Sequence, residues 1–311
     1  MEANGLPTPR GQHGAEVLAF PQVQDRSDLV RAQGAEAPVG PQRGLDRVEV
    51  CIRDGVLLDL HTPKEMRKLV VGNWKSHKSL AEAQEFVDVL DAHLGADAAG
   101  WEAWIAPPAP YLALLARQSA RSGTLSWVAQ NVSAHAAGAH TGEFTAEMLV
   151  SCGIHAALVG HSERRERFGD VDDVVRSKVV RCLEAGVLPI LCCGETRVER
   201  EAGQAFARVE AQIHHALSGL AGSDPVVVAY EPVWAIGTGL TASAAQAEDM
   251  HAHLESVLAA LGAAGTQILY GGSVNPGNVR ELFEEPHVHG ALVGGASLDP
   301  ASFAQLVRAG A

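Results

Sequence analysis

The 311-residue chain lacks the features that mark membrane, secreted and nucleic-acid-binding proteins. It has no apolar run of the roughly 20 residues needed to span a bilayer. Its N-terminus has no basic region followed by an apolar stretch, so a secretory signal is not expected. The formal charge of −13 argues against non-specific binding to nucleic acid. We therefore expect a cytoplasmic protein that binds neither membranes nor nucleic acid.

Cysteine is scarce, and its count is odd. The five cysteines include the adjacent pair Cys192 and Cys193, and none of them forms the CxxC spacing that suggests a zinc site. A disulfide framework is not expected, and reduced buried thiols are the simpler interpretation. The sequence therefore predicts no metal site.

Residues 1–65 differ in composition from the rest of the chain. The first 44 residues are rich in Gly, Pro, Gln and Ala without a sustained period, which is typical of disorder. Residues 48–60 could form a short hairpin about Asp54-Gly55. Ten acidic residues against seven basic ones disfavour a transit peptide. We expect a disordered N-terminal extension, or a start codon assigned too early, followed by one domain over residues 66–311.

From Met66 onward, short apolar runs alternate with amphipathic stretches, the pattern of a parallel sheet built from βα units. Eight runs are candidate strands: 68–72, 103–107, 126–130, 156–160, 188–192, 226–230, 267–271 and 290–294. Helical spacing is clear over 79–94 and 242–261. Eight such units predict an α/β fold closed as a (β/α)8 TIM barrel. A doubly wound open sheet is the alternative, but no GxGxxG motif follows the first candidate strand.

Active sites of such barrels lie at the C-terminal ends of the strands, and ionisable residues follow several of the candidate strands. Glu231 ends the sixth run, where partial burial would raise its basicity. His161 follows the fourth run at the start of a helix, where backbone N–H dipoles disfavour the imidazolium form. Lys75 follows the first run and could stabilise an enolate or bind a phosphate. Glu163 is placed to hold Lys75.

Glycine pairs follow the last two candidate strands. Gly271-Gly272-Ser273 and Gly294-Gly295 offer backbone N–H groups that a ligand can approach closely. Such groups near the start of a helix stabilise a phosphate dianion. The sequence therefore predicts a phosphate-binding site at this end of the barrel.

Five motifs, in family order from about Lys68 to the C-terminus, resemble the triosephosphate isomerase family. They are GNWK (72–75), GHSERR (160–165), AYEPVWAIGTG (229–239), YGGSV (270–274) and GALVGGASL (290–298). The most specific element is YEPVWAIGTG. The resemblance implies an aldose–ketose isomerase that interconverts dihydroxyacetone phosphate and D-glyceraldehyde 3-phosphate through an enediol(ate). Such an enzyme serves glycolysis and gluconeogenesis and needs no metal or organic cofactor.

Carried over residue by residue, the resemblance also implies roles for the site. Glu231 is the base, and His161 is a neutral electrophile and proton shuttle. Lys75 and Asn73 support the reaction, and Glu163 holds Lys75. The substrate phosphate is expected on four backbone N–H groups, those of Gly237, Ser273, Gly294 and Gly295.

The resemblance further implies a lid over residues 232–240 and a homodimer. In the dimer, the loop 138–143 reaches the neighbouring active site through Thr141. Ser76-His77 stand where the family usually has Met-Asn, and His140 replaces an aromatic residue. Two alternatives therefore remain open: an isomerase of a tetrulose phosphate, and a non-catalytic barrel that binds phosphate.

Overall fold

The computed structural model describes residues 68–95, 102–119, 125–236 and 241–310. The expected N-terminal extension, residues 1–65, lies outside the described residues, as does the hairpin expected at 48–60. The description begins at Lys68, one residue before the first strand. The part of the domain that carries the predicted strands is therefore described almost throughout.

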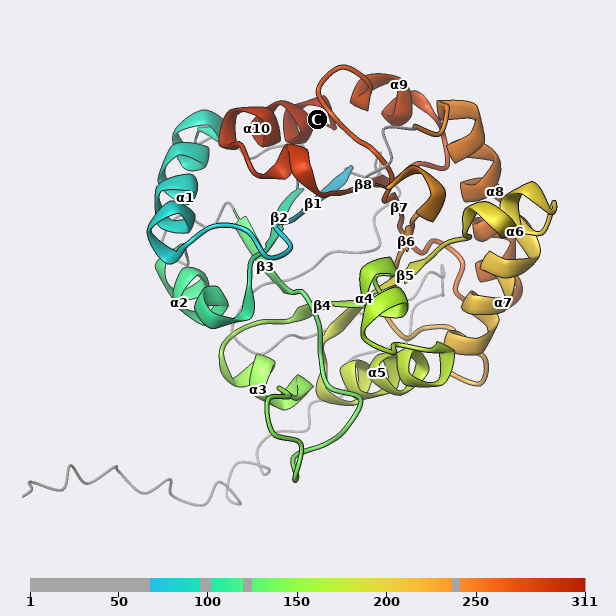
Figure 1. Ribbon diagram of the computed structural model, residues 1–311, viewed down its shortest axis with the longest axis horizontal. Helices are drawn as coiled ribbons and strands as arrows, with labels where there is room; N and C mark the ends of the chain where they lie inside the picture. Colours follow the sequence, from blue (N-terminus) through green and yellow to red (C-terminus); the bar gives the residue numbers. More distant parts are fainter. Residues whose placement is uncertain (1–67, 96–101, 120–124, 237–240, 311) are drawn as a thin grey trace, which may run out of the picture. The chain divides into compact units, whose positions relative to one another are not determined.

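The described residues form eight parallel strands that close into a barrel in sequence order (Figure 1). The strands are β1 (Leu69–Asn73), β2 (Glu102–Ala106), β3 (Leu125–Ala129), β4 (Ala156–Val159), β5 (Leu188–Cys193), β6 (Val227–Tyr230), β7 (Ile268–Tyr270) and β8 (Gly290–Val293). Closure is made by β1 and β8, with Leu69 opposite Gly290. The predicted (β/α)8 barrel is confirmed, and each strand boundary lies within one residue of the predicted run.

Helices surround the barrel. They are α1 (Leu80–Leu94), α2 (Ala109–Ser119), α3 (Ala146–Ser151), α4 (Ser162–Arg167), α5 (Asp172–Ala185), α6 (Arg197–Glu201), α7 (Ala205–Leu217), η1 (Val233–Ala235), α8 (Ala244–Ala260), α9 (Val279–Glu284), η2 (Gly295–Ser297) and α10 (Pro300–Ala309). The first and last long helices, α1 and α10, lie side by side and complete the ring (Figure 1). Ser79 and Glu82 form a capping box that fixes the start of α1 directly after the loop following β1.

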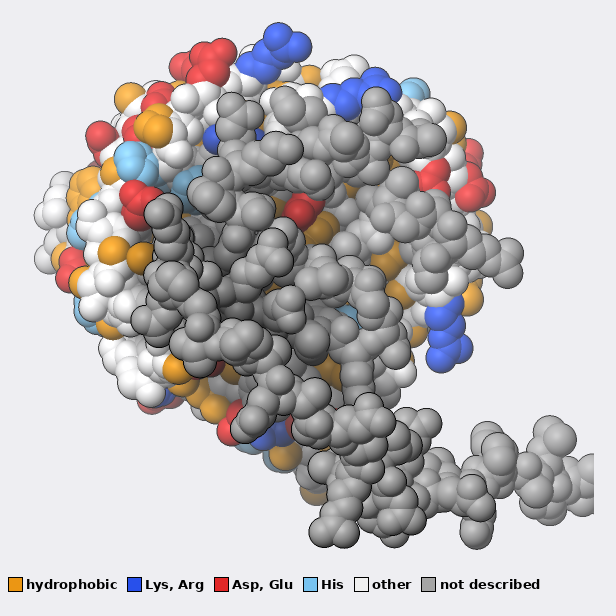
Figure 2. Space-filling model, turned by 180° about the vertical axis from the view of Figure 1, so that it is seen from behind, with side chains coloured by type: hydrophobic (Ala, Val, Ile, Leu, Met, Phe, Trp, Pro, Cys, Tyr) orange, Lys and Arg blue, Asp and Glu red, His pale blue; other side chains and the backbone are white. Residues whose placement is uncertain are grey.

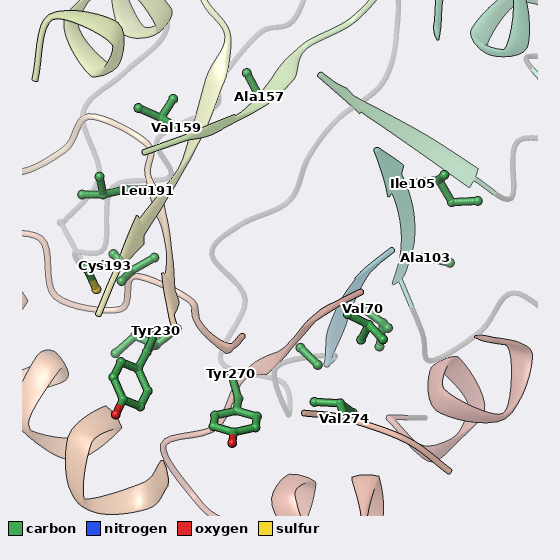
Figure 3. Close-up of a cluster of buried hydrophobic side chains, with 14 of the residues drawn as sticks. Val70, Ala103, Ile105, Ala157, Val159, Leu191, Cys193, Tyr230, Tyr270 and Val274 are labelled. Atoms are coloured by element: carbon green, nitrogen blue, oxygen red, sulfur yellow. The ribbon is translucent and has the colours of Figure 1, made fainter. Parts of the chain in front are cut away.

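The hydrophobic core has two layers because neighbouring residues of a strand point to opposite faces. Leu69 and Val71 belong to a cluster inside the barrel, whereas Val70 belongs to the cluster between strands and helices. Figure 3 shows members of this outer cluster, such as Ile105 and Tyr230, pointing from the strands toward the surrounding helices. Burial on both faces explains why the strands are nearly continuous apolar runs. Most polar residues of the strands therefore lie at or near the strand ends, such as Asn73 in β1 and Glu102 in β2.

The described cysteines are free thiols: Cys152, Cys182, Cys192 and Cys193. Three are buried, as expected, but Cys152 is partly exposed because it caps the short surface helix α3. The expectation of buried thiols is therefore wrong for Cys152. Burial raises the pKa of Cys182 and of Cys193 to about 12, so both stay protonated at neutral pH.

The surface bears charges of both signs. Figure 2 shows acidic and basic side chains distributed along the described rim of one face. Among the described helices, none is long and apolar enough to cross a membrane.

Candidate active site

The structure joins the predicted catalytic residues into one chain of contacts at the C-terminal ends of β1, β4 and β6. Lys75 Nζ lies 2.9 Å from Glu163 Oε1, and His161 Nε2 lies 3.0 Å from Glu231 Oε1. Glu163 Oε2 lies 3.8 Å from His161 Nδ1 and thus links the two pairs. Lys75 and Glu231, far apart in the sequence, are therefore linked through Glu163 and His161 because the barrel brings the strand ends together.

Glu231 is almost completely buried, with 2% of its surface exposed. Its Oε1 faces His161, and its Oε2 accepts a 2.8 Å hydrogen bond from the backbone N–H of Ser162. Ser162 begins α4, so the carboxylate is held at the start of that helix, where backbone N–H groups favour negative charge. Both carboxylate oxygens thus have polar partners, and a buried carboxylate needs such partners.

His161 is buried between Glu231 and the start of α4. Its Nδ1 accepts a hydrogen bond from the backbone N–H of Glu163 at 3.3 Å, which leaves the proton of a neutral ring on Nε2, facing Glu231. Burial is the largest single influence and lowers the pKa of His161, but the charge and hydrogen bond of Glu231 and the charge of Glu163 together make the net shift upward. The sequence indicated only the effect of the helix start, because it did not reveal the contact with Glu231.

Lys75 has a left-handed backbone with φ of +50°, which is unusual for a residue other than glycine. Its N–H donates to Asn73 Oδ1 at 3.0 Å, and its carbonyl accepts from Gln130 Nε2 at 2.8 Å. The same Gln130 nitrogen donates to the carbonyl of Ala106 at 2.8 Å. Strained conformations of this kind persist where the surroundings hold them, and they cluster at functional sites. Asn73 and Gln130 thus fix the direction of the Lys75 side chain.

Glu163 holds the Lys75 ammonium in the position that the sequence suggested. Burial raises the pKa of Glu163, but the hydrogen bond and charge of Lys75 lower it more, and the net shift is downward. The carboxylate therefore stays ionised at neutral pH and keeps the ammonium paired until an anionic ligand competes for it.

The predicted phosphate-binding segments lie after β7 and β8. Ser273 is exposed, and Gly294 and Gly295 form the start of η2. A Cβ placed on Gly294 would lie 3.4 Å from Lys75 Cε, so this backbone runs beside the ammonium-bearing chain. A Cβ on Gly295 would meet no described atom within 4 Å, which shows open space at that position. Gly237 lies outside the described residues, as does the lid from 237 to 240.

Glu195, at the end of β5, was not selected from the sequence as a site residue. It has no exposed surface, and its Oε1 accepts hydrogen bonds from three side chains. These are Tyr230 Oη at 3.1 Å, Trp234 Nε1 at 2.8 Å and Arg200 Nη1 at 2.6 Å. Because Trp234 lies in η1, Glu195 anchors the segment that follows Glu231. The sequence feature that could have identified Glu195 is its position shortly after a predicted strand. Gln130 lies in the same kind of position.

Thr141 lies in the loop between β3 and α3, drawn in green in Figure 1. Every residue from 135 to 143 in this loop is exposed. The rings of His135 and His140 stack with centroids 4.1 Å apart and planes 7° apart, which braces the loop from within. The predicted dimer loop thus presents its side chains to solvent.

Among the described residues, no group of three or more His, Cys, Asp or Glu could hold a metal ion. The assembled groups instead suit proton transfer: a buried carboxylate, an imidazole with its proton on Nε2, and an ammonium beside a glycine-rich backbone. A carboxylate can remove a proton next to a carbonyl, while the imidazole and ammonium stabilise the negative oxygen that forms.

The family model for triosephosphate isomerase matches residues 68–310. The triosephosphate isomerase of Dechloromonas aromatica is 46% identical over 249 residues, covering 78% of this chain and 98% of that protein. That of Prosthecochloris aestuarii is 46% identical over 248 residues, with the same coverage. That of Xanthomonas axonopodis pv. citri is 47% identical over 250 residues, covering 79% of this chain and 98% of its own.

Proposed function

Because the chain belongs to the triosephosphate isomerase family, we propose that it interconverts dihydroxyacetone phosphate and D-glyceraldehyde 3-phosphate with Glu231 as the base. The observation that carries this assignment is the contact chain from Lys75 through Glu163 and His161 to Glu231. It supports the proposal because an ammonium, two carboxylates and an imidazole lie together at one end of the barrel. Family membership favours this activity over a non-catalytic barrel that only binds phosphate.

To act as the base, the Glu231 carboxylate has to move away from the Ser162 backbone N–H and the His161 ring. In the structure, Ser162 and His161 contact its two oxygens. A bound substrate would draw the carboxylate toward its C1 carbon, where Glu231 removes a proton and later returns it at C2. The intermediate is an enediol(ate). The Glu231 carboxylate carries out both proton transfers at the two carbons.

His161 acts on the two substrate oxygens as the neutral imidazole. Its Nε2 proton, which faces Glu231 in the structure, can be donated to a substrate oxygen once Glu231 turns away. The same movement removes the main influence that raises the pKa of His161, so burial and the Lys75 charge then favour the neutral ring. The ring can therefore pass a proton between adjacent oxygens.

The phosphate is proposed to bind between Lys75 and the backbone N–H groups of Ser273, Gly294 and Gly295, with Gly237 closing over it as part of the lid 232–240. Gly294 lies against the Lys75 side chain, which supports a shared site. A phosphate held this way fixes the reacting carbons relative to Glu231. Exclusion of water by the lid protects the intermediate.

The assembly and cellular setting are also proposals. Residues 66–311 are the isomerase domain, and residues 1–65 are an extension without a catalytic role. The enzyme is a cytoplasmic homodimer in which Thr141 reaches the neighbouring subunit. The exposure of every residue from 135 to 143 supports this role, because exposed side chains are available to a neighbouring subunit.

A tetrulose phosphate remains the alternative substrate, since Ser76 and His77 lie next to Lys75. Initial rates with D-glyceraldehyde 3-phosphate and with a tetrulose phosphate, each in a coupled assay, decide between them. We expect kcat/KM to favour the triose phosphate by orders of magnitude. A preference for the tetrulose phosphate would assign the alternative, and turnover of neither would overturn the proposed function.

A further inference from the structure

Lys78 lies at the end of the loop that follows β1, three residues after Lys75. Its Nζ donates a 2.7 Å hydrogen bond to the carbonyl of Leu298, the residue after η2. The ammonium also lies 4.7 Å from the ring centroid of Phe86 and 5.3 Å from that of Trp74. Both distances are within the range of cation–π attraction. The ammonium therefore has a fixed position between the first and last βα units of the barrel.

Trp74 makes a parallel contact from the same loop. Its Nε1 donates to the carbonyl of Ser297 at 3.1 Å, so two side chains of one loop bind two successive carbonyls at the end of η2. Ser297 is fully buried, and its hydroxyl donates to the carbonyl of Gly294 at 2.7 Å. The loop after β1 is thus connected by hydrogen bonds to the backbone proposed to bind phosphate.

The backbone of Lys78 indicates that its side chain has a specific use. Its φ of +69° is left-handed, as is that of Lys75, and the hydroxyl of Tyr111 donates to its carbonyl at 2.5 Å. Glycine would adopt this conformation without strain. A lysine there costs stability unless its side chain makes compensating contacts, and the contacts with Leu298, Trp74 and Phe86 are such contacts.

The geometry of the neighbouring groups shows what a shift of this loop would change. The Lys75 side chain runs against Gly294, with a Cβ there only 3.4 Å from Cε. Movement of the loop relative to η2 would therefore separate the Lys75 ammonium from the backbone N–H groups of Gly294 and Gly295. The ammonium and these N–H groups could then no longer bind the same anion in a favourable arrangement.

We propose that Lys78 is a positioning residue of the isomerase, which holds the loop after β1 against η2 so that Lys75 and the Gly294-Gly295 backbone bind the substrate phosphate together. This inference rests on the proposed function. Lys78 does not touch the substrate; it acts through Leu298 and the ring of Trp74. Its expected influence is on phosphate binding, whereas the proton transfer at Glu231 and His161 is left intact.

The test compares Lys78→Met with the wild type. Methionine keeps an unbranched stem but removes the charge and the donor. We expect KM for D-glyceraldehyde 3-phosphate and the inhibition constant of inorganic phosphate to rise together by about tenfold, since small misplacements of binding groups are costly. The value of kcat should change by less than about threefold, because the lost interaction is made equally in the ground and transition states.

Two further variants and a control make the result specific. Lys78→Gly relieves the left-handed strain and should fold at least as well, yet it should raise both constants as Lys78→Met does. Lys78→Arg keeps a cation that can stack on the rings and reach the carbonyl, and should restore most of the binding. Arg117→Met removes one positive charge from the exposed end of α2 and should behave as the wild type.

Lys78 also lies near the carboxylates of Glu82, Asp299 and Glu85. A lysine that only balanced these charges would, when replaced, lower the melting temperature and leave both constants unchanged. That result would overturn the proposal, as would a fall in kcat at constant KM. Phosphate binding is measured separately by calorimetric titration of the full chain. If the wild type binds phosphate but turns over no triose phosphate, the proposed function is wrong. The role of Lys78 in phosphate binding is then still decided by comparing the phosphate affinities of the wild type and Lys78→Met.

Discussion

Histidines illustrate how strongly the role of a single residue depends on its neighbours. His251 is completely buried, and desolvation lowers its pKa to about 3, so it stays neutral inside the fold. His287 lies at the surface between two carboxylates of α8, where Nδ1 pairs with Glu248 and Nε2 lies 3.1 Å from Glu255. The hydrogen bond with Glu248 raises the pKa of His287. The fold therefore shifts the pKa values of these two histidines in opposite directions.

His287 should make stability depend on pH above about pH 6.5, the ordinary pKa of a histidine. Because its pKa is raised in the folded protein, the folded state binds more protons than the unfolded state above about pH 6.5. The stabilisation is complete below that value and is lost as pH rises through the folded-state pKa. Urea unfolding at pH 6 and pH 9 should show a larger loss for the wild type than for His287→Gln. The exposed His93→Gln should follow the wild type, and equal losses in all three proteins would contradict this account.

At the same scale, the sequence located the residues at the strand ends better than it identified what they contact. Glu231, His161 and Lys75 were found because each follows a strand, a position that the alternation of apolar runs reveals. The hydrogen bond from Ser162 to Glu231 and the bridge made by Gln130 could not be predicted. They depend on which strand ends face each other across the barrel, and on the left-handed turn at Lys75.

At the scale of elements, strands were predictable because both of their faces are buried. The run at 68–72 differs from the observed strand Leu69–Asn73 by one residue at each end. The helix expected at 242–261 begins two residues later, at Ala244, because Ser243 caps it. Short elements such as η2 were not predicted, since three residues carry no periodic signal. Yet η2 carries the Gly294-Gly295 backbone that the phosphate proposal requires.

Side chains added at Gly295, after β8, should leave the fold intact but weaken phosphate binding. A Cβ on Gly295 meets no described atom within 4 Å, so Gly295→Ala and Gly295→Val should fold normally. Both should weaken competitive inhibition by inorganic phosphate, valine by about tenfold or more, because its methyl groups occupy the space assigned to the anion. Inhibition constants and melting temperatures measure the two effects separately. Inhibition that survives Gly295→Val unchanged would show that the anion binds elsewhere.

At the scale of the whole molecule, we expect the exposed loop between β3 and α3 to contact the neighbouring subunit of the proposed dimer. An arginine at Thr141 would place a bulky charge in the subunit contact, so Thr141→Arg should both weaken the dimer and lower kcat. Ala259→Arg adds the same charge on an exposed position of α8 and serves as the control. Sedimentation and activity are measured across one dilution series. A wild-type protein that is fully active as a monomer would rule out the role of this loop.

The central claim, that Glu231 is the catalytic base, is tested most directly by Glu231→Asp. Aspartate keeps the carboxylate but withdraws it by one methylene, about 1 Å, and such misplacement costs about a hundredfold in rate. In a coupled assay with D-glyceraldehyde 3-phosphate, kcat should fall by that factor or more, while inhibition by inorganic phosphate stays near the wild-type value and shows that the site is folded. A folded Glu231→Asp enzyme with the kcat of the wild type would contradict the account.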